Sequence, residues 1–190
     1  MTATSTASTT PAADEYGGRF ADYISRIPPG TDVLDLLARQ REETLALFDT
    51  VPEARGAHRY APGKWSVKQV LVHLSDTERI MAYRALRIGR GDPTPLPGFD
   101  EEAYAPVSGA DAQPLAALVA EWGEVRQATV SLFRHLPPEA WGRRGIASEV
   151  PLSVRALAWI IAGHVRHHLG VLAERYGLPA APSAARKETR

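Results

Sequence analysis

The segment "VRALAWIIAGHVRHHLGVLAERYG", Val154–Gly177, combines a helical pattern of apolar residues with three histidines. Its apolar residues recur every three or four positions, which is the period of an amphipathic helix. The inner stripe predicted from this period consists of Leu157, Ile161, His164, His168 and Leu172. Ser153 is a suitable N-cap, and Gly177 is a suitable C-terminal stop. The segment therefore predicts a long helix whose buried face carries two histidines.

Three more segments have the same period, and each is about 20 residues long or longer. They are "TDVLDLLARQREETLALFDTV" (31–51), "SVKQVLVHLSDTERIMAYRALRIGRG" (66–91) and the stretch from about Asp111 to Leu136. Thr31 and Ser66 are the predicted N-caps of the first two, and Pro114 lies in the predicted first turn of the third. Four such helices predict an all-α, four-helix bundle.

The longest connection between the predicted helices runs from Gly91 to Gly109. It contains "DPTPLPGFD" (92–100), where three prolines in five residues exclude a helix. The following "FDEEAYA" (99–105) is interpreted as a short, solvated helical turn. The connection is either a crossover between helices or a cover over one mouth of the bundle.

Length and composition indicate one globular domain. The chain has 190 residues, 44% of them apolar and 23% charged, and its formal net charge is zero. These values allow a full hydrophobic core and give no reason to expect nucleic acid or a membrane as a partner. We expect a disordered N-terminal tail over residues 1–18, the bundle over 19–178 and a flexible C-terminal tail over 179–190.

The chain contains no cysteine. This excludes disulfides, thiolate metal ligands and a cysteine nucleophile, and it fits a cytoplasmic protein. No apolar run is long enough to span a bilayer.

The histidines on the predicted inner faces suggest a metal site. His73 lies beside the apolar stripe of the second predicted helix, as His164 and His168 lie on that of the fourth. A buried imidazole with an unsatisfied nitrogen costs about 1–3 kcal/mol, and a shared divalent cation would satisfy three at once. The spacing H-x-x-x-H alone is also typical of core histidines that hydrogen-bond to carbonyl groups, so this alternative stays open.

Two long segments, residues 61–106 ("APGKWSVKQVLVHLSDTERIMAYRALRIGRGDPTPLPGFDEEAYAP") and 141–177 ("WGRRGIASEVPLSVRALAWIIAGHVRHHLGVLAERYG"), resemble the DinB/YfiT-like superfamily. This superfamily of bundle proteins is unrelated to the DNA polymerase that shares the DinB name. The resemblance extends over about residues 20–178. Its most specific features are the Trp65-Ser66 helix start, His73 within the second helix and the H-x-x-x-H late in the fourth.

The resemblance implies an up-down-down-up-like bundle, often a homodimer, with a divalent metal ion, zinc or nickel. The ligands it implies are His73, His164 and His168. It gives His167 no ligand role, and we interpret His167 as a second-shell or surface residue. Three neutral imidazoles leave the ion its full charge and leave coordination positions open, as in catalytic zinc sites. Such an ion lowers the pKa of bound water toward about 7, and it would equally stabilise a bound thiolate.

Three function classes follow. The first is a metal-dependent thiol S-transferase for a small-molecule substrate, because the resemblance implies relatives that use bacillithiol or mycothiol and the chain has no nucleophilic cysteine. The second is a metal-dependent hydrolase, which needs a general base. The third is a non-enzymatic, metal-binding stress-response protein, in which the ion links the second helix to the fourth.

The candidate catalytic residues are less well defined than the metal ligands. Asp76, Glu78 and Glu101 are candidate bases, since Val165 occupies the position where a zincin motif carries its glutamate. Asp76 and Glu78 also fit a solvated helix face with local ion pairs.

Aromatic and arginine side chains give further candidates. The arginines of the second helix, Arg79, Arg84 and Arg87, are candidates to hold an anionic cosubstrate or are ordinary surface residues. Trp65 either lines a pocket mouth or forms a hydrophobic staple, which we favour. The other tryptophans, Trp122, Trp141 and Trp159, are predicted in the core or an interface.

Overall fold

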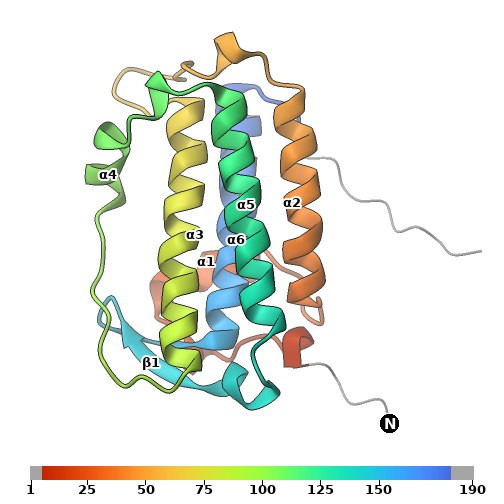
Figure 1. Ribbon diagram of the computed structural model, residues 1–190, viewed down its shortest axis with the longest axis vertical. Helices are drawn as coiled ribbons and strands as arrows, with labels where there is room; N and C mark the ends of the chain where they lie inside the picture. The colour runs from red at the N-terminus through yellow and green to blue at the C-terminus, as the bar shows by residue number, and fades with distance from the viewer. Residues whose placement is uncertain (1–5, 181–190) are drawn as a thin grey trace, which may run out of the picture.

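Four long helices form the body of the protein in a computed structural model that describes residues 6–180 (Figure 1). They are α2 (Val33–Asp49), α3 (Val67–Gly89), α5 (Leu115–Arg134) and α6 (Val154–Tyr176). Two short helices, α1 (Ala21–Ser25) and α4 (Glu101–Val107), and a hairpin of strands β1 (Arg144–Ala147) and β2 (Val150–Ser153) lie around them. No helix within residues 6–180 is long and apolar enough to cross a membrane. The predicted four-helix bundle is confirmed, with the hairpin as a small addition.

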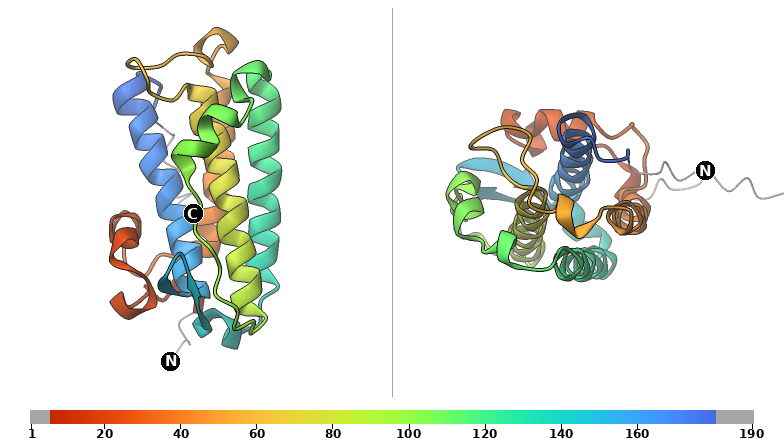
Figure 2. Two further views of the ribbon diagram at one scale, coloured as in Figure 1. Left: turned by 90° about the vertical axis from the view of Figure 1, so that its left-hand side faces the viewer. Right: turned by 90° about the horizontal axis from the view of Figure 1, so that it is seen from above.

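The helices run up, down, down and up in the order α2, α3, α5, α6 (Figure 1). Seen from above, α2 and α3 lie on opposite corners, and each packs between α5 and α6 (Figure 2). Because α3 and α5 are parallel, the connection between them must return along the full length of the bundle. Residues 90–114 are therefore a crossover, and α4 within them packs against α3.

The helix ends show which capping predictions were sound. The Ser66 side chain accepts a hydrogen bond from the backbone N–H of Gln69, and Ser153 accepts one from Ala156, so both predicted N-caps are confirmed. Gly177 ends α6 in the left-handed conformation, as predicted. The prediction for Thr31 was wrong, because the neighbouring Asp32 carboxylate accepts from the first free N–H groups of α2.

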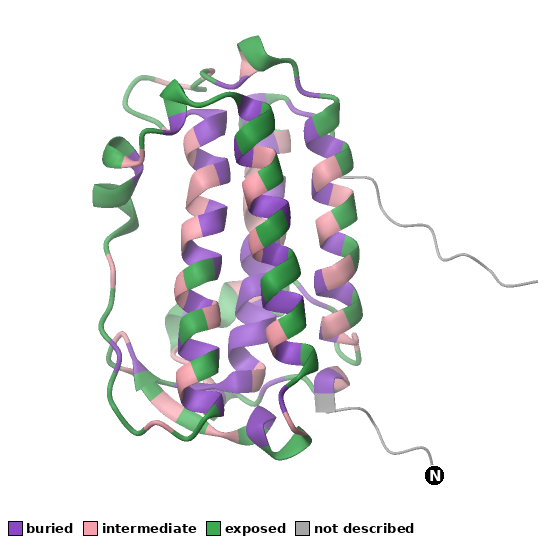
Figure 3. Ribbon diagram, viewed as in Figure 1, coloured by how far each residue is buried: buried purple, intermediate pink, exposed green. Residues whose placement is uncertain are grey.

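The apolar core is divided into two clusters along the bundle axis. Of α6, the buried apolar residues between Val154 and Ala162 belong to one cluster, and Val165, Leu169, Leu172 and Tyr176 belong to the other. Buried residues face the bundle interior throughout (Figure 3). The three tryptophans that were predicted to lie in the core or an interface, Trp122, Trp141 and Trp159, are all buried. Gly163 and His164 thus lie where one apolar cluster ends and the next begins.

The chain before α1 differs from the predicted disordered tail. Within residues 6–18, Ala7 and Glu15 are buried against the bundle. The Glu15 carboxylate accepts hydrogen bonds from the Ser153 hydroxyl at 2.6 Å and the Arg155 guanidinium at 2.6 Å. These polar contacts fix a segment whose composition suggests no structure. Residues 1–5 and 181–190 of the two predicted tails lie outside the described residues.

Candidate metal centre

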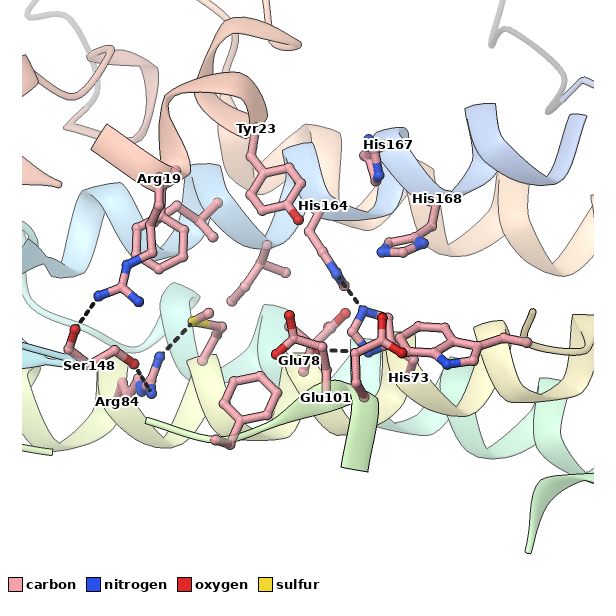
Figure 4. Close-up of a pocket in the computed structure, with 18 residues that line it drawn as sticks. Arg19, Tyr23, His73, Glu78, Arg84, Glu101, Ser148, His164, His167 and His168 are labelled. Carbon is pink, nitrogen blue, oxygen red and sulfur yellow. Dashed lines mark hydrogen bonds between the residues drawn. The ribbon is translucent and has the colours of Figure 1, made fainter. Parts of the chain in front are cut away.

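Three histidine side chains meet between α3 and α6. His73 extends from α3, and His164 and His168 extend from successive turns of α6 (Figure 4). The Nε2 atoms of His73 and His164 are 2.9 Å apart, and one candidate ligand nitrogen of each ring lies within 4.8 Å of the others. The two helices therefore adjoin at the level of the histidines.

The cluster fits a divalent transition-metal ion. Zinc binds histidine nitrogens at about 2.0–2.1 Å, so two ligands at a tetrahedral angle are about 3.3 Å apart. The distance of 2.9 Å between His73 and His164 is close to this value. Imidazole suits zinc, nickel, copper and iron, so the donor set favours this group of metals over calcium or magnesium.

Burial keeps the three imidazoles in the form that a metal needs. It lowers the pKa of His73 to about 4, with a smaller contribution from His167. Burial also holds the pKa of His164 and of His168 well below the usual value of 6.5, and neighbouring histidines lower both further. All three rings are neutral at pH 7, with lone pairs free to coordinate.

Gly163 allows helix α1 to pack closely against α6 beside the histidine cluster. A Cβ at this position would lie 2.0 Å from the Tyr23 carbonyl oxygen, so only glycine lets α1 approach α6 this closely. The Tyr23 ring consequently lies edge-on to His164 at 5.4 Å and to His167 at 5.7 Å between ring centroids. His167 thus lies beside the cluster, with its ring 4.9 Å from that of His168 between centroids. Tyr23 was not predicted from the sequence, where the glycine in the middle of α6 is its only signal.

A buried ion pair lies beside the cluster. Both Glu78 carboxylate oxygens accept hydrogen bonds from Arg126, each at 2.7 Å, and both side chains are almost completely buried. Arg126 also donates to the Gln40 side chain at 3.0 Å and to the Leu37 carbonyl at 3.2 Å. The network joins α2, α3 and α5. Because both oxygens are occupied, Glu78 is held as a structural anion rather than as a free base.

A cavity of about 310 Å³ opens from the histidine cluster (Figure 4). It is lined by Arg19, Phe20, Tyr23, Trp65, His73, Thr77, Glu78, Met81, Arg84, Phe99, Glu101, Glu102, Ser148, Ile160, Ile161, His164, His167 and His168. This volume is in the range of small-molecule sites.

The remaining candidates divide between the cavity and the outer surface. Of the three candidate bases, Glu101 and Glu78 line the cavity, but Asp76 does not, and its carboxylate lies 3.5 Å from Arg79. Arg79 also pairs with Glu121 at 2.7 Å.

Of the three candidate arginines of α3, Arg84 lines the cavity, and Arg79 and Arg87 do not. Arg87 pairs with Asp92 instead. Trp65 contacts the His73 ring at 4.8 Å and lines the cavity, so it fits the pocket-mouth alternative that the sequence left open.

Comparison with known proteins agrees with this architecture. YfiT from Bacillus subtilis, described as "a probable metal-dependent hydrolase with an unusual four-helix bundle topology", superposes with a TM-score of 0.65 at 17% identity. The match covers 77% of this chain and 87% of YfiT. The mycothiol-dependent maleylpyruvate isomerase superposes with a TM-score of 0.64 at 15% identity. That match covers 80% of this chain but only 63% of the isomerase.

Sequence comparison gives the family. No curated protein sequence matches the chain. The family model of the DinB superfamily matches residues 36–172, which include the three clustered histidines. The chain therefore belongs to the DinB superfamily.

Proposed function

We propose that His73, His164 and His168 hold a divalent metal ion, zinc or nickel, in a metal-dependent enzyme. The observation that carries this proposal is the convergence of three neutral imidazoles from two helices at the wall of a 310 Å³ cavity. When bound, such an ion supplies Lewis-acid chemistry, lowering the pKa of a coordinated thiol or water. The open side of the cluster gives a small molecule access to it.

The reaction that we favour is S-transfer from a low-molecular-weight thiol of the bacillithiol or mycothiol type. The thiol releases its proton to solvent, the sulfur–carbon bond forms as the bond to the leaving group breaks, and the leaving group takes the electron pair. The chain itself supplies no cysteine, so the cosubstrate is the only thiol required. Similarity to a mycothiol-dependent enzyme supports this choice.

Tyr23 has a suitable position to assist the leaving group. Its side chain lines the cavity beside His164 (Figure 4). Burial raises the pKa of the Tyr23 hydroxyl, and the negative charge of Glu101 raises it further. The hydroxyl therefore keeps its proton at neutral pH and can donate a hydrogen bond to charge that develops in the cavity.

Hydrolysis is the second candidate, and the position of Glu101 in the cavity wall is the observation that favours it. This carboxylate enters the cavity from α4 on the crossover. It can accept a proton from an attacking water, whereas Glu78 is held by Arg126 and Asp76 does not line the cavity. The description of YfiT as a metal-dependent hydrolase agrees with this alternative.

A purely structural ion fits the site less well. Structural zinc sites are closed by four protein ligands. Within residues 6–180, the cluster of potential ligands contains three histidines, and a cavity borders it. An enzyme is therefore preferred over a non-enzymatic metal-binding stress-response protein.

The test compares thiol and water as nucleophiles. Protein loaded with zinc or nickel should accelerate conjugation of 1-chloro-2,4-dinitrobenzene to one member of a panel of bacillithiol, mycothiol and glutathione. His164→Ala should abolish the acceleration, whereas His135→Ala, which changes an exposed histidine outside the cavity, should not.

If the protein hydrolyses esters without a thiol and Glu101→Gln loses this activity, hydrolysis replaces S-transfer as the proposed reaction. Identical rates for the wild type and His164→Ala in both assays would refute both enzyme classes. The homodimer and the cytoplasmic location stay predictions, the first to be measured by light scattering and the second by cell fractionation.

A further inference from the structure

Two arginines lie at the end of the cavity farthest from the histidines, and neither is paired with a carboxylate in the part of the chain that the structure describes. Arg84 of α3 and Arg19, which lies just before α1, flank Ser148 at this end (Figure 4). Neither guanidinium forms an ion pair with a carboxylate within residues 6–180. Arg84 is only 1% exposed. A buried cation without a counter-ion is costly, so its retention indicates a ligand or a structural use.

The contacts of Arg84 leave part of its hydrogen-bonding capacity free. Its Nη2 donates to the Pro97 carbonyl and the Ser148 hydroxyl, both at 2.8 Å, and its Nη1 contacts the Met81 sulfur at 3.5 Å. A guanidinium has five N–H groups. The Nε–H and one Nη1–H therefore have no protein acceptor among the described residues.

Ser148 and Arg19 complete the set of donors. The Ser148 hydroxyl accepts from Arg84, so its own hydrogen remains available, and the Ser148 carbonyl accepts from Arg19. Burial lowers the pKa of Arg84, and the positive charge of the nearby Arg19 lowers it further. An anion between the two guanidinium groups would offset this effect.

Apolar side chains line part of the wall between the two ends of the cavity. Met81 lies between His73 and Arg84 on α3, and Ile160 and Ile161 precede His164 by about one turn on α6. The rings of Phe20 and Phe99 lie beside the guanidinium groups of Arg19 and Arg84, at 5.6 Å and 5.8 Å from the ring centroids. The 11 residues from His73 to Arg84 correspond to about 16 Å along the helix axis. The polar members of the same lining are Thr77, Glu78, Glu101 and Glu102.

We propose that Arg84, Arg19 and Ser148 bind the carboxylate of a substrate whose apolar chain extends toward the histidine cluster. This proposal rests on the proposed function only in placing the reacting atom at the histidines. A carboxylate is favoured over a phosphate because it carries one charge and two acceptor oxygens, which match the small number of free donors. The substrate class is therefore a carboxylic acid with an apolar acyl or aryl chain.

Calorimetry on chelator-treated protein tests the carboxylate site separately from the metal. The probes are straight-chain monocarboxylates from butanoate to decanoate, the matching primary alcohols, and inorganic and hexyl phosphate. Carboxylates should bind at least tenfold more tightly than alcohols of equal length. Their affinity should rise roughly fourfold for each methylene that the apolar section accommodates.

Variants identify which end of the cavity binds the carboxylate. Arg84→Gln and Arg19→Gln should each weaken carboxylate binding at least tenfold and leave alcohol binding unchanged. Arg79→Gln removes a surface charge from the same helix and should have no effect. His164→Ala should also bind carboxylates normally. Since Arg19 is exposed, its variant gives an answer even if Arg84→Gln fails to fold.

Several outcomes would overturn the proposal. Equal affinity for alcohols and carboxylates, or unchanged binding in both arginine variants, would show that the arginines only hold the hairpin and crossover in place. Loss of binding in His164→Ala would move the carboxylate to the histidine end. Preference for hexyl phosphate would overturn the carboxylate assignment. None of these results depends on a bound metal, so the proposed function can fail or stand independently.

Discussion

The histidine end and the arginine end of the cavity are built from different kinds of structure. The histidine end consists mainly of side chains from α3 and α6, held by the packing of long helices. The arginine end combines one helical residue, Arg84, with Arg19, Ser148 of the hairpin turn and Pro97 of the crossover. Regular helices can position ligands for an ion, whereas the connecting segments adapt the far end to a particular substrate.

The largest expected effect concerns the buried ion pair beside the histidine end. Arg126→Met leaves the Glu78 charge buried and unpaired, which should lower the free energy of unfolding by about 3–5 kcal/mol in urea denaturation. The double variant Arg126→Met with Glu78→Leu should recover most of this loss. A cost below about 1 kcal/mol for the single variant would show that Glu78 is not held by the pair and reopen its role as a base.

The next effect tests the contact that closes the cavity above the histidines. Gly163→Ala should destabilise the protein by up to about 3 kcal/mol, because the new methyl group would overlap the Tyr23 carbonyl and displace α1. Gly170→Ala, on the same helix with open space around it, is the matched control. It should stabilise the protein by about 0.5–1 kcal/mol. Equal effects of the two substitutions would contradict the close packing of α1.

The third prediction separates the two ends by pH, since only one of them contains histidine. His73 has a pKa of about 4 in the folded protein against 6.5 when exposed, so the unfolded chain binds more protons between these values. The stability of the metal-free protein should therefore fall as the pH falls from 6.5 toward 4. His73 alone contributes a loss of about 2 kcal/mol at pH 5. Constant stability between pH 7 and pH 5 in urea titrations would contradict the buried, neutral cluster.

The smallest effect belongs to the hairpin turn at the arginine end. Ser148 and Glu149 both have positive φ angles, of 50° and 65°. Glu149→Gly should stabilise the protein by about 0.5–1 kcal/mol, because glycine adopts this conformation without strain. Glu149→Ala removes the same exposed side chain but keeps the strain, so it should give no gain in thermal denaturation. A gain from both would assign the effect to the charge of Glu149 instead.

The difference between the histidine end and the arginine end also explains which parts of the site could be predicted from the sequence. Helical periodicity placed His164 and His168 on one inner face, and His73 on another helix, because a period of 3.6 residues fixes which side chains point inward. The meeting of α3 and α6 needed the structure or a family resemblance. The buried ion pair of Arg126 was not predicted. Its signal in the sequence is a charged residue on a mainly apolar helix face, four residues after the buried Trp122.

Of the arginine end, the sequence offered only Arg84, as one of three candidate arginines, and the rest could not be predicted by this reasoning. The hairpin turn has Ser-Glu where Asn-Gly or Asp-Gly is usual, and its second strand contains Pro151. The segment before α1 has the composition of a disordered tail, and its order depends on long-range contacts such as Glu15 with Arg155. Non-local contacts of this kind leave no periodic pattern in the sequence.

Titration of the chelator-treated protein with zinc and nickel decides whether the three histidines form a metal site. We expect one ion per chain, with an affinity that falls more than about 100-fold in each of His73→Ala, His164→Ala and His168→Ala. His135→Ala should bind like the wild type. Absence of binding to the wild type, or binding of equal strength in the three cluster variants, would contradict a metal site between α3 and α6.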